Sequence, residues 1–318
     1  MRMRALVAAS AVLAVGVTMM GASALASPGT RARAGICTAP PAYRKLAGRL
    51  SAGIQGALLG RDDDHAVAVY DTVTGVSCYA DSDTHFSSAS IVKAIILAAL
   101  LRWHEQTGTP LSSWENDEAT LMITQSDNDA ATDLWDEVGM RRLQSFLDLA
   151  KMGQTRLGED GYWGLTQVTA HDELLLLELL TRPNPVLTAA SRAYQLGLMA
   201  RVISSQRWGT PAGAPSGVTV HVKNGWLPDG SGWHVNSIGA FTGEGRNYLI
   251  AVLTDENASE REGIDTIEAV ARVVHRDLNQ GRLIPKARLA ASVASPAPTS
   301  WAVVPALPTP PPAPAPAP

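Results

Sequence analysis

The sequence predicts an α+β fold in three layers (α-β-α). Its core would be an antiparallel five-stranded sheet, flanked by helices from the two ends of the chain, with an all-helical subdomain inserted into the sheet. Two observations support this prediction. Segments with strand patterns occur early and late in the chain, and the stretch between them has helical apolar spacing. With 318 residues, 46% of them hydrophobic, the chain can also bury a sizeable core.

The strands are predicted from short apolar or alternating runs that are bounded by turn residues. The first two strands enclose Thr74-Gly75, which predicts a hairpin. The predicted strands cover residues 66–71, 76–79, 218–223, 235–241 and 247–254.

The helices are predicted from apolar residues that recur every three or four positions. A first helix at 43–59 precedes the sheet, and a last helix at 263–277 closes the domain. The helices expected between them cover residues 91–105, 114–124, 129–138, 141–151, 170–180 and 187–204.

Residues 1–26 are predicted to be a secretory signal peptide, followed by a short linker at 27–36. Arg2 and Arg4 precede an apolar run, and Ala24-Leu25-Ala26 forms a small-x-small cleavage site. A transmembrane anchor is the competing interpretation, but the run is short for a bilayer span. We therefore expect a secreted, extracellular protein without a membrane anchor once the signal peptide is removed.

The folded domain is expected at 37–284, and residues 285–318 are expected to form a disordered Pro/Ala-rich tail. This tail repeats Pro and Ala with hardly a charge, a composition that cannot bury a core. The formal charge of -4 and the scattered basic residues exclude nucleic acid as an expected partner. A small molecule or a cell-surface polymer is the expected ligand, and the protein is expected to be a monomer.

Cys37 and Cys78 are the only cysteines, and in an oxidising compartment such a pair predicts one disulfide. Closing this loop would stabilise the fold by about 4 kcal/mol on the chain-entropy model. The alternative is a pair of buried free thiols.

The segment Ser90-Ile91-Val92-Lys93 places a Ser and a Lys three residues apart at a predicted helix start, and hence on one face of the helix. This arrangement provides a nucleophile and its proton acceptor. Alone, the pattern can arise by chance, with Lys93 a solvated helix residue. Ser126-Asp127-Asn128 and Lys223-Asn224-Gly225 follow it along the chain.

In this order, the three motifs resemble the signature of class A serine β-lactamases and of the related penicillin-binding D,D-peptidases. The resemblance covers about residues 42–278. It implies the β-lactamase/transpeptidase-like version of the predicted fold, with residues 37–284 as a class A β-lactamase-like catalytic domain. The three motifs would then meet in a cleft between the sheet and the helical subdomain.

The resemblance also implies roles for these residues. Ser90 would attack a carbonyl carbon to form an acyl-enzyme, and Lys93 would accept its proton, a carboxylate acting through water being the alternative base. Ser126 would relay a proton to the leaving nitrogen with the help of Lys223, and Asn128 would hold the amide side chain of the substrate. Asp127 would instead support its own loop.

The third motif would bind the rest of the substrate. Lys223 would attract a substrate carboxylate, and backbone N–H groups of Ser90 and Trp226 would hold the oxyanion. Asn224 and Gly225 complete this substrate-binding segment. The family usually has Thr or Ser at the position of Asn224, and the bulkier amide therefore puts the substrate preference in doubt.

A larger departure from class A concerns deacylation. The sequence has no E-x-x-L-N pattern after the second motif, and the corresponding loop at 155–170 looks shortened. Glu159 is the only glutamate there that could act as the base, the alternative being a solvated acid in a Gly-rich turn. Without a positioned base, deacylation could be about 10²- to 10⁴-fold slower. Trp163 and Trp233 are expected in the core, and Trp226 either there or in the cleft.

Other kinds of chemistry are disfavoured. The chain has no G-x-S-x-G elbow, no zinc-hydrolase spacing among its histidines and no Gly-rich phosphate loop, so we expect no metal and no organic cofactor. His85 and His234, the histidines nearest to the motifs, are expected to be structural or exposed.

The sequence therefore predicts a secreted serine hydrolase that opens β-lactams or related amides and esters through an acyl-enzyme on Ser90. Two alternatives remain open. The first is a D,D-peptidase that acts on peptidoglycan stem peptides, or a slow esterase. The second is a non-hydrolytic protein that binds β-lactams or wall fragments, since the usual deacylating glutamate is missing.

Overall fold

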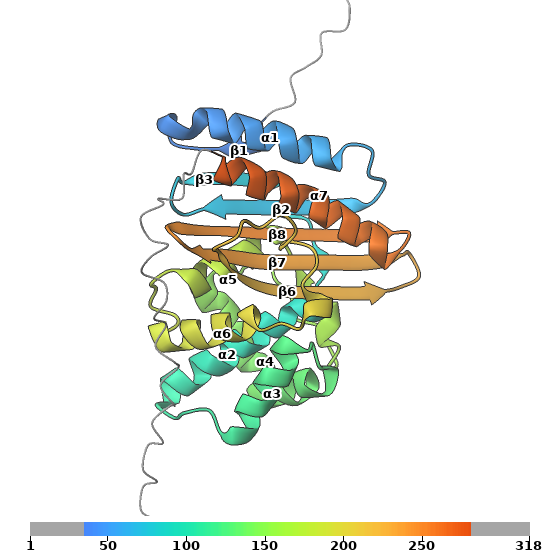
Figure 1. The fold of residues 1–318 in the computed structure, drawn as a ribbon. Coiled ribbons are helices and arrows are strands. Elements are labelled where there is room, and N and C mark those ends of the chain that lie inside the picture. Colours follow the sequence, from blue (N-terminus) through green and yellow to red (C-terminus); the bar gives the residue numbers. More distant parts are fainter. Residues whose placement is uncertain (1–34, 281–318) are drawn as a thin grey trace, which may run out of the picture. The chain divides into compact units, whose positions relative to one another are not determined.

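The computed structural model describes residues 35–280, at the centre of which lies a six-stranded antiparallel sheet of order β1-β3-β2-β8-β7-β6 (Figure 1). The predicted signal peptide, most of the linker and the Pro/Ala-rich tail lie outside the described residues. The strands of this sheet are β1 (Cys37–Thr38), β2 (Asp64–Asp71), β3 (Val76–Ala80), β6 (Thr219–Pro228), β7 (Trp233–Gly243) and β8 (Arg246–Asn257).

The five predicted strands are present, and the prediction of five is wrong by one because β1 extends the sheet. With only two residues, β1 is too short to show any periodicity in the sequence. The Cys37–Cys78 disulfide confirms the predicted pairing and joins β1 to β3 at the register Cys37↔Cys78. A separate two-stranded sheet pairs β4 (Phe86–Ser87) with β5 (Gln167–Val168).

The predicted helices are also present, with shifted ends. They are α1 (Arg44–Leu58), α2 (Val92–Thr107), α3 (Ser113–Thr124), α4 (Asn128–Ala150), α5 (Ala170–Thr181), α6 (Ala189–Ala200) and α7 (Glu260–Asn279). The two helices predicted at 129–138 and 141–151 form one element, α4, which is interrupted at Gly139 (φ 74°, ψ 151°). Because that φ is in the left-handed region, glycine allows the break without strain.

The two faces of the sheet bury different cores. Val67 and Val69 of β2 pack in a cluster with residues of α1 and α7, whereas Ala66 and Ala68 pack with the helical part of the chain. This alternation is the period of two that a strand requires. Figure 1 shows α1 and α7 together along one face of the sheet and α2 to α6 on the other side, so the predicted three-layer α+β fold is confirmed.

Within the helical part, α2 is the central element, because every residue from Val92 to Leu101 is buried. A short 3-10 turn, η2 (Ala89–Ile91), leads directly into α2 and carries Ser90. The core thus fixes the helix start at which the first motif lies.

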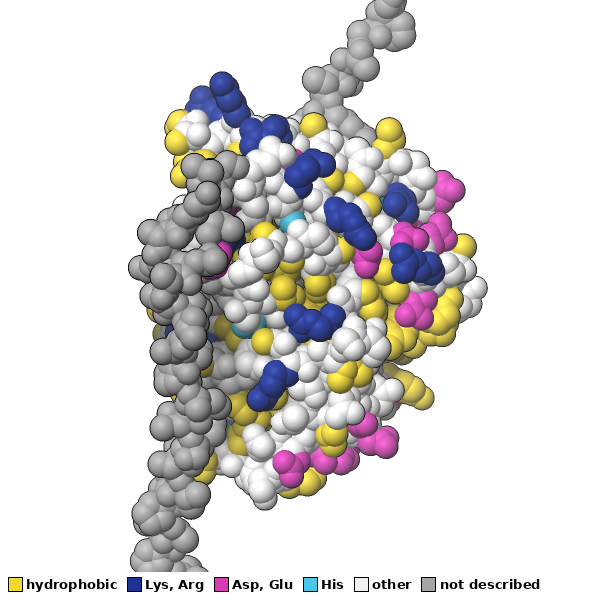
Figure 2. All heavy atoms as spheres, in the orientation of Figure 1, with side chains coloured by type: hydrophobic (Ala, Val, Ile, Leu, Met, Phe, Trp, Pro, Cys, Tyr) yellow, Lys and Arg dark blue, Asp and Glu magenta, His cyan; other side chains and the backbone are white. Residues whose placement is uncertain are grey.

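None of the helices within residues 35–280 is long and apolar enough to cross a bilayer. On the face drawn in Figure 2, Lys and Arg side chains are scattered among uncharged and acidic ones. That face therefore has no continuous basic surface.

Candidate active site

The first motif lies where η2 passes into α2. Ser90 is half-buried, whereas the side chain of Lys93, one turn further on, is fully buried. The residue before Ser90, Ala89, has a φ of 46°. This left-handed backbone conformation is uncommon for residues other than glycine. Such strained residues cluster at functional sites.

Lys93 reaches from α2 to the second motif. Its Nζ donates hydrogen bonds to the carbonyl oxygen of Ser126 (2.7 Å) and to Asn128 Oδ1 (2.7 Å), with a longer contact to Ser126 Oγ (3.3 Å). Among the bonds of Lys93 within residues 35–280, none is to Ser90. A neutral amine needs only two of these acceptors, so it can stay in place with its lone pair free.

Burial lowers the pKa of Lys93 from the usual 10.5 to about 7, although the charge of Asp127 acts in the opposite direction. Within the described residues, Lys93 forms no ion pair with a carboxylate. A general base works best when its pKa is near the operating pH. Lys93 therefore has the burial and the pKa that a proton acceptor needs.

Ser126 connects the two lysines. Its Oγ accepts a hydrogen bond from Lys223 Nζ (2.9 Å) as well as the longer contact from Lys93. Its φ of 60° is again left-handed. Because Lys223 donates to this oxygen, the O–H of Ser126 remains available to donate to a substrate.

Asp127 and Asn128 begin α4. The carboxylate of Asp127 accepts a hydrogen bond from Ala130 N (2.9 Å) and so caps the helix. The side chain of Asn128 is exposed, and within the described residues its Nδ2 has no hydrogen-bond partner. Asn128 can therefore hold Lys93 through Oδ1 and still donate to a ligand.

Lys223 is fully buried on β6, and its Nζ also donates to the carbonyl oxygen of Asn224 (2.9 Å). Burial, together with the charge of Lys93, lowers the pKa of Lys223 well below its usual value. Two buried lysines without a paired carboxylate are costly for a fold, which favours a functional role.

Gly225 allows β6 to pass close to the nucleophile. A Cβ at this position would lie 2.6 Å from Ser90 N, 2.8 Å from Ser88 O and 2.9 Å from Ile91 N. Asn236, which pairs with Gly225 across β6 and β7, donates to the carbonyl oxygens of Ser87 (2.8 Å) and Ser88 (3.2 Å). Sequence reasoning missed Asn236, although a polar residue in an apolar strand was a signal.

The Gly225→Ala variant is expected to lose about 1–3 kcal/mol of unfolding free energy, a typical cost of overpacking, because its new methyl group meets backbone atoms. Urea denaturation measures this loss. Gly230→Ala is the control, since a Cβ at Gly230 has no atom within 4 Å. Equal stabilities of the two variants would contradict the close packing of β6 against η2.

The side chain of Asn224 is not placed to bind a substrate, as the sequence analysis expected, but is bonded within the protein. Its Nδ2 donates to the carbonyl oxygens of Gln206 (2.9 Å) and Trp208 (3.0 Å), and its side chain is buried. Both amide hydrogens are therefore used within the protein. The expectation that this amide could still donate to a substrate carboxylate has to be corrected accordingly.

Trp226 follows Gly225 on β6, the edge strand of the sheet, and is half-buried. Its ring packs edge-to-face against Trp208, with the centroids 5.8 Å apart. An edge strand leaves part of its backbone N–H groups unpaired in the sheet. The predicted oxyanion role of the Ser90 and Trp226 N–H groups stays a prediction.

Trp163 packs against the core on the helical side of the sheet, as expected, and also lies beside Lys93. Its half-buried ring has its centroid 4.7 Å from Lys93 Nζ, and its Nε1 donates to Thr132 Oγ1 on α4 (3.1 Å). A cation over an aromatic face is attracted by the ring. Trp163 thus covers one side of the Lys93 amine. The second tryptophan expected in the core, Trp233, is half-buried against the α1/α7 side of the sheet.

Glu159, the predicted candidate base, is exposed, and within the described residues its carboxylate makes no hydrogen bond or ion pair. It lies in a tight turn, where a Cβ at Gly158 would be 2.1 Å from Tyr162 O. The structure therefore brings Lys93, Ser126 and Lys223 together, places Gly225 beside Ser90, and leaves Glu159 without contact to them.

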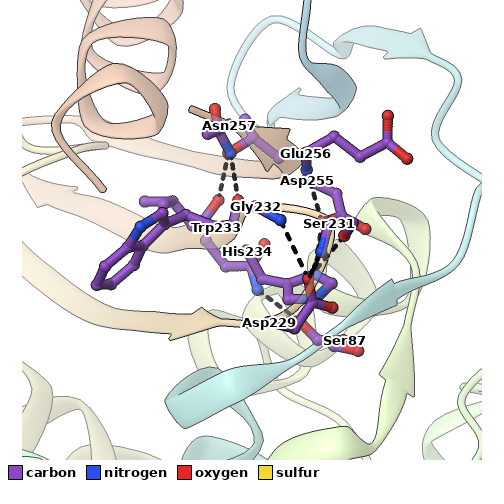
Figure 3. A network of polar contacts seen from close by, with 12 residues as sticks. Ser87, Asp229, Ser231, Gly232, Trp233, His234, Asp255, Glu256 and Asn257 are labelled. Atoms are coloured by element: carbon purple, nitrogen blue, oxygen red, sulfur yellow. Dashed lines mark hydrogen bonds and ion pairs between the residues drawn. The ribbon is translucent and has the colours of Figure 1, made fainter. Parts of the chain in front are cut away.

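His234 has a structural role, as Figure 3 shows. It is buried, with Nε2 2.7 Å from Asp229 Oδ2 and Nδ1 2.9 Å from Asp255 Oδ1. The second contact has the geometry of an ion pair rather than of a hydrogen bond. Hydrogen bonds from Ser231 and His234 keep the pKa of Asp229 below its usual range. His234 thus fixes the β6–β7 turn. His85 also has a structural contact, since its Nε2 lies 2.8 Å from the carbonyl oxygen of Gln154.

Within residues 35–280, no group of three His, Cys, Asp or Glu side chains is arranged to hold a metal ion. The site brings together two buried lysines, the hydroxyl of Ser126 and the amide of Asn128, with Ser90 beside them.

A Ser-Lys pair at the start of a buried helix, a Ser-Asp-Asn corner and a Lys-x-Gly edge strand define the class of serine acyl-transfer proteins. Residues 115–278, a little over half of the chain, match the model of the β-lactamase enzyme family. The chain belongs to this family.

Solved structures show the same fold. A class A β-lactamase from Bacteroides cellulosilyticus is 16% identical, with a TM-score of 0.64 over 73% of this chain and 98% of that one. PBP-A is 20% identical (TM-score 0.64; 73% and 96% covered), and a β-lactamase from Desulfarculus baarsii is 23% identical (TM-score 0.60; 74% and 97%). No curated protein sequence matches the chain.

Proposed function

We propose that this protein is a serine hydrolase that forms an acyl-enzyme on Ser90, with β-lactams or related amides and esters as acyl donors. The observation that carries the proposal is the set of contacts of the two buried lysines, because Lys93 and Lys223 both meet the hydroxyl of Ser126. This arrangement can move a proton between the nucleophile and the leaving group. Membership of the β-lactamase enzyme family supports the same chemistry.

In the proposed mechanism, Ser90 Oγ attacks the carbonyl carbon of the acyl donor. Neutral Lys93 takes the proton of the Ser90 hydroxyl during this attack. Backbone N–H groups of Ser90 and Trp226 hold the oxyanion, each such donor being worth about 10²- to 10³-fold in rate. Ser126 then donates its proton to the leaving nitrogen or oxygen. The proton on Lys93 restores the Ser126 hydroxyl along their existing contact.

We further propose that the acyl-enzyme is long-lived. The ring of Trp163 covers Lys93, and the carboxylate of Glu159 makes no contact with the Ser90–Lys93 pair. Glu159, the candidate base that the sequence predicted, is therefore not placed to activate water at the acyl carbon. A PBP-A variant in which a leucine is replaced by glutamate, with a TM-score of 0.64 and 20% identity, was solved as an acyl-enzyme with penicillin G, which supports acylation by a penicillin on this fold. A penicillin-binding peptidase remains the second candidate function, favoured by this missing base.

Secretion is part of the proposal as well. A disulfide between Cys37 and Cys78 suits an oxidising compartment, in which such bonds persist. Fractionation of cells that express the whole chain would test it, with the protein expected outside the cytoplasm and shortened after Ala26.

The nucleophile is tested by labelling. The protein is incubated with penicillin G or with a phenylacetylglycine aryl ester, digested, and the modified peptide is sequenced by mass spectrometry. The proposal expects the label on Ser90. A label on another residue, or no label from either acyl donor, would refute it.

The Trp163→Glu variant is expected to shorten the lifetime of the acyl-enzyme by about 10²-fold, because it introduces a general base next to Lys93. Trp163→Gln is the matched control, since it removes the same ring and adds no charge. The decay of the acyl adduct, followed by intact mass, measures the effect. Equal lifetimes in the two variants would show that the missing base does not limit deacylation.

A further inference from the structure

Asn236 is a polar side chain in an apolar row of the sheet. It is fully buried on β7, and Ile238 and Ala240, two and four positions further on, pack in the core shared with the helical part of the chain. Its Nδ2 donates two hydrogen bonds, but its Oδ1 is buried and has no partner within the described residues. An apolar residue would avoid the cost of this unpaired oxygen, which favours a role of Asn236 in the site.

The two bonds of Asn236 hold the backbone that leads to the nucleophile. Its Nδ2 donates to the carbonyl oxygens of Ser87 (2.8 Å) and Ser88 (3.2 Å). In addition, Ser88 N donates to the carbonyl oxygen of Thr166, the residue before β5 (2.8 Å). The peptide units directly before Ala89 are therefore fixed by two separate parts of the chain.

Ala89 needs this support, because its φ of 46° lies in the left-handed region, which a residue with a Cβ adopts only at a cost in free energy. Such a conformation persists where the surrounding structure imposes it. Since Ser90 is the next residue, relaxation of Ala89 would turn both the Oγ and the N–H of the nucleophile.

Asn236 also occupies an oxygen that competes for the Ser90 N–H. In a 3-10 turn, an N–H donates to the carbonyl oxygen three residues earlier, as Ile91 N does to Ser88 O (3.2 Å). For Ser90 that carbonyl is the one of Ser87, which accepts from Asn236. Within residues 35–280, no hydrogen bond joins Ser90 N to Ser87 O, which leaves this N–H for the proposed oxyanion.

We infer that Asn236 is a positioning residue for acylation. By holding the carbonyl groups of Ser87 and Ser88, it keeps Ala89 left-handed and so directs the Oγ and the N–H of Ser90. This inference rests on the proposed function, because it concerns the geometry of the same Ser90 chemistry.

The Asn236→Leu variant tests the inference, since leucine has nearly the shape of asparagine but no hydrogen-bond donor. The acylation rate at saturating penicillin G is expected to fall about 10²-fold, the effect of a small misplacement of the reacting groups. The concentration that gives the half-maximal rate should stay nearly unchanged. Quenched-flow mass spectrometry of the adduct measures both quantities. An unchanged maximal rate would overturn the inference.

Asn257→Leu is the matched control. Asn257 on β8 is also fully buried, and its Nδ2 donates to the carbonyl oxygen of Trp233 (2.6 Å) and to Thr254 Oγ1 (2.9 Å) (Figure 3). Its Oδ1 likewise has no partner within the described residues. The control should therefore lose a similar amount of thermal stability and acylate at the wild-type rate. If it slowed acylation as much as Asn236→Leu, the inference would be wrong.

The Ala89→Gly substitution tests how Asn236 acts, because glycine adopts a left-handed φ without the penalty that a Cβ brings. Added to Asn236→Leu, it is expected to restore the acylation rate about tenfold, which is the size of that penalty. The gain should be smaller in the wild-type protein, where Asn236 already holds the conformation. Equal rates in Asn236→Leu with and without Ala89→Gly would overturn the inference.

Ala89→Val gives an independent test if the Asn236 variant fails to fold. A β-branched residue adopts a left-handed φ only under strain, so Ala89→Val should acylate about tenfold more slowly than Ala89→Gly. Equal rates would overturn the inference. If penicillin G and a phenylacetylglycine aryl ester both fail to label Ser90 of the wild-type protein, the proposed function itself fails. If Ser90 is labelled and Asn236→Leu acylates as fast as the wild type, only the inference fails.

Discussion

The Ser90→Ala variant is expected to lose covalent acylation completely and to reduce kcat by about 10⁴-fold or more, the effect of removing a catalytic nucleophile. Ser90 is the nucleophile in this account because it stands at the start of the buried helix α2, beside the backbone of Gly225. Intact mass after incubation with penicillin G measures the loss.

This variant should leave the fold unchanged. Ser90 is half-buried, and within the described residues its hydroxyl makes no hydrogen bond that alanine would remove. Thermal unfolding of the two proteins should therefore coincide. An acyl adduct on the folded variant would show that another residue is the nucleophile.

The Lys93→Met variant is expected to slow acylation by about 10²- to 10⁴-fold, the usual contribution of a general base. Methionine keeps the length of the buried side chain and removes the amine that contacts Ser126 and Asn128. The rate of adduct formation measures the effect. An unchanged rate would exclude Lys93 as the proton acceptor.

The pH dependence of the wild-type protein tests the same role. Since the pKa of Lys93 in the folded protein is about 7, the fraction of neutral amine rises with pH through 7. The acylation rate should rise over this range and level off above it. A rate that falls between pH 6 and 8 would contradict the account.

The same shift predicts how stability depends on pH. Between about pH 7 and the usual pKa of 10.5, the unfolded chain binds a proton at Lys93 that the folded protein does not. The unfolding free energy should therefore rise with pH in this window, and less steeply in the Lys93→Met variant. Parallel pH curves for the two proteins would mean that the pKa of Lys93 is not lowered.

Much of the fold could be predicted because its elements are long and periodic. The buried run of α2 and the alternation in β2 follow directly from apolar spacing. β1 could not be predicted, since two residues have no period and only its disulfide and its pairing with β3 reveal it. The start and end of each helix depend on caps and tertiary contacts that periodicity does not describe.

The candidate site was predictable in its residue types but not in its side-chain contacts. The motifs point to Ser90, Lys93 and Ser126, because short motifs of this kind are local. The side chain of Asn224 contacts Gln206 and Trp208, which lie in a separate segment of the chain. Trp163 contacts Lys93, which lies 70 residues earlier in the sequence. Such contacts depend on where the loops pack.

The most direct test of acylation at Ser90 is the intact mass of the protein over time, after mixing with penicillin G, a chromogenic cephalosporin or a phenylacetylglycine aryl ester. An adduct of one acyl group per chain is expected to form, to decay slowly and to be missing in Ser90→Ala. The absence of any adduct from all three acyl donors would contradict acylation at Ser90.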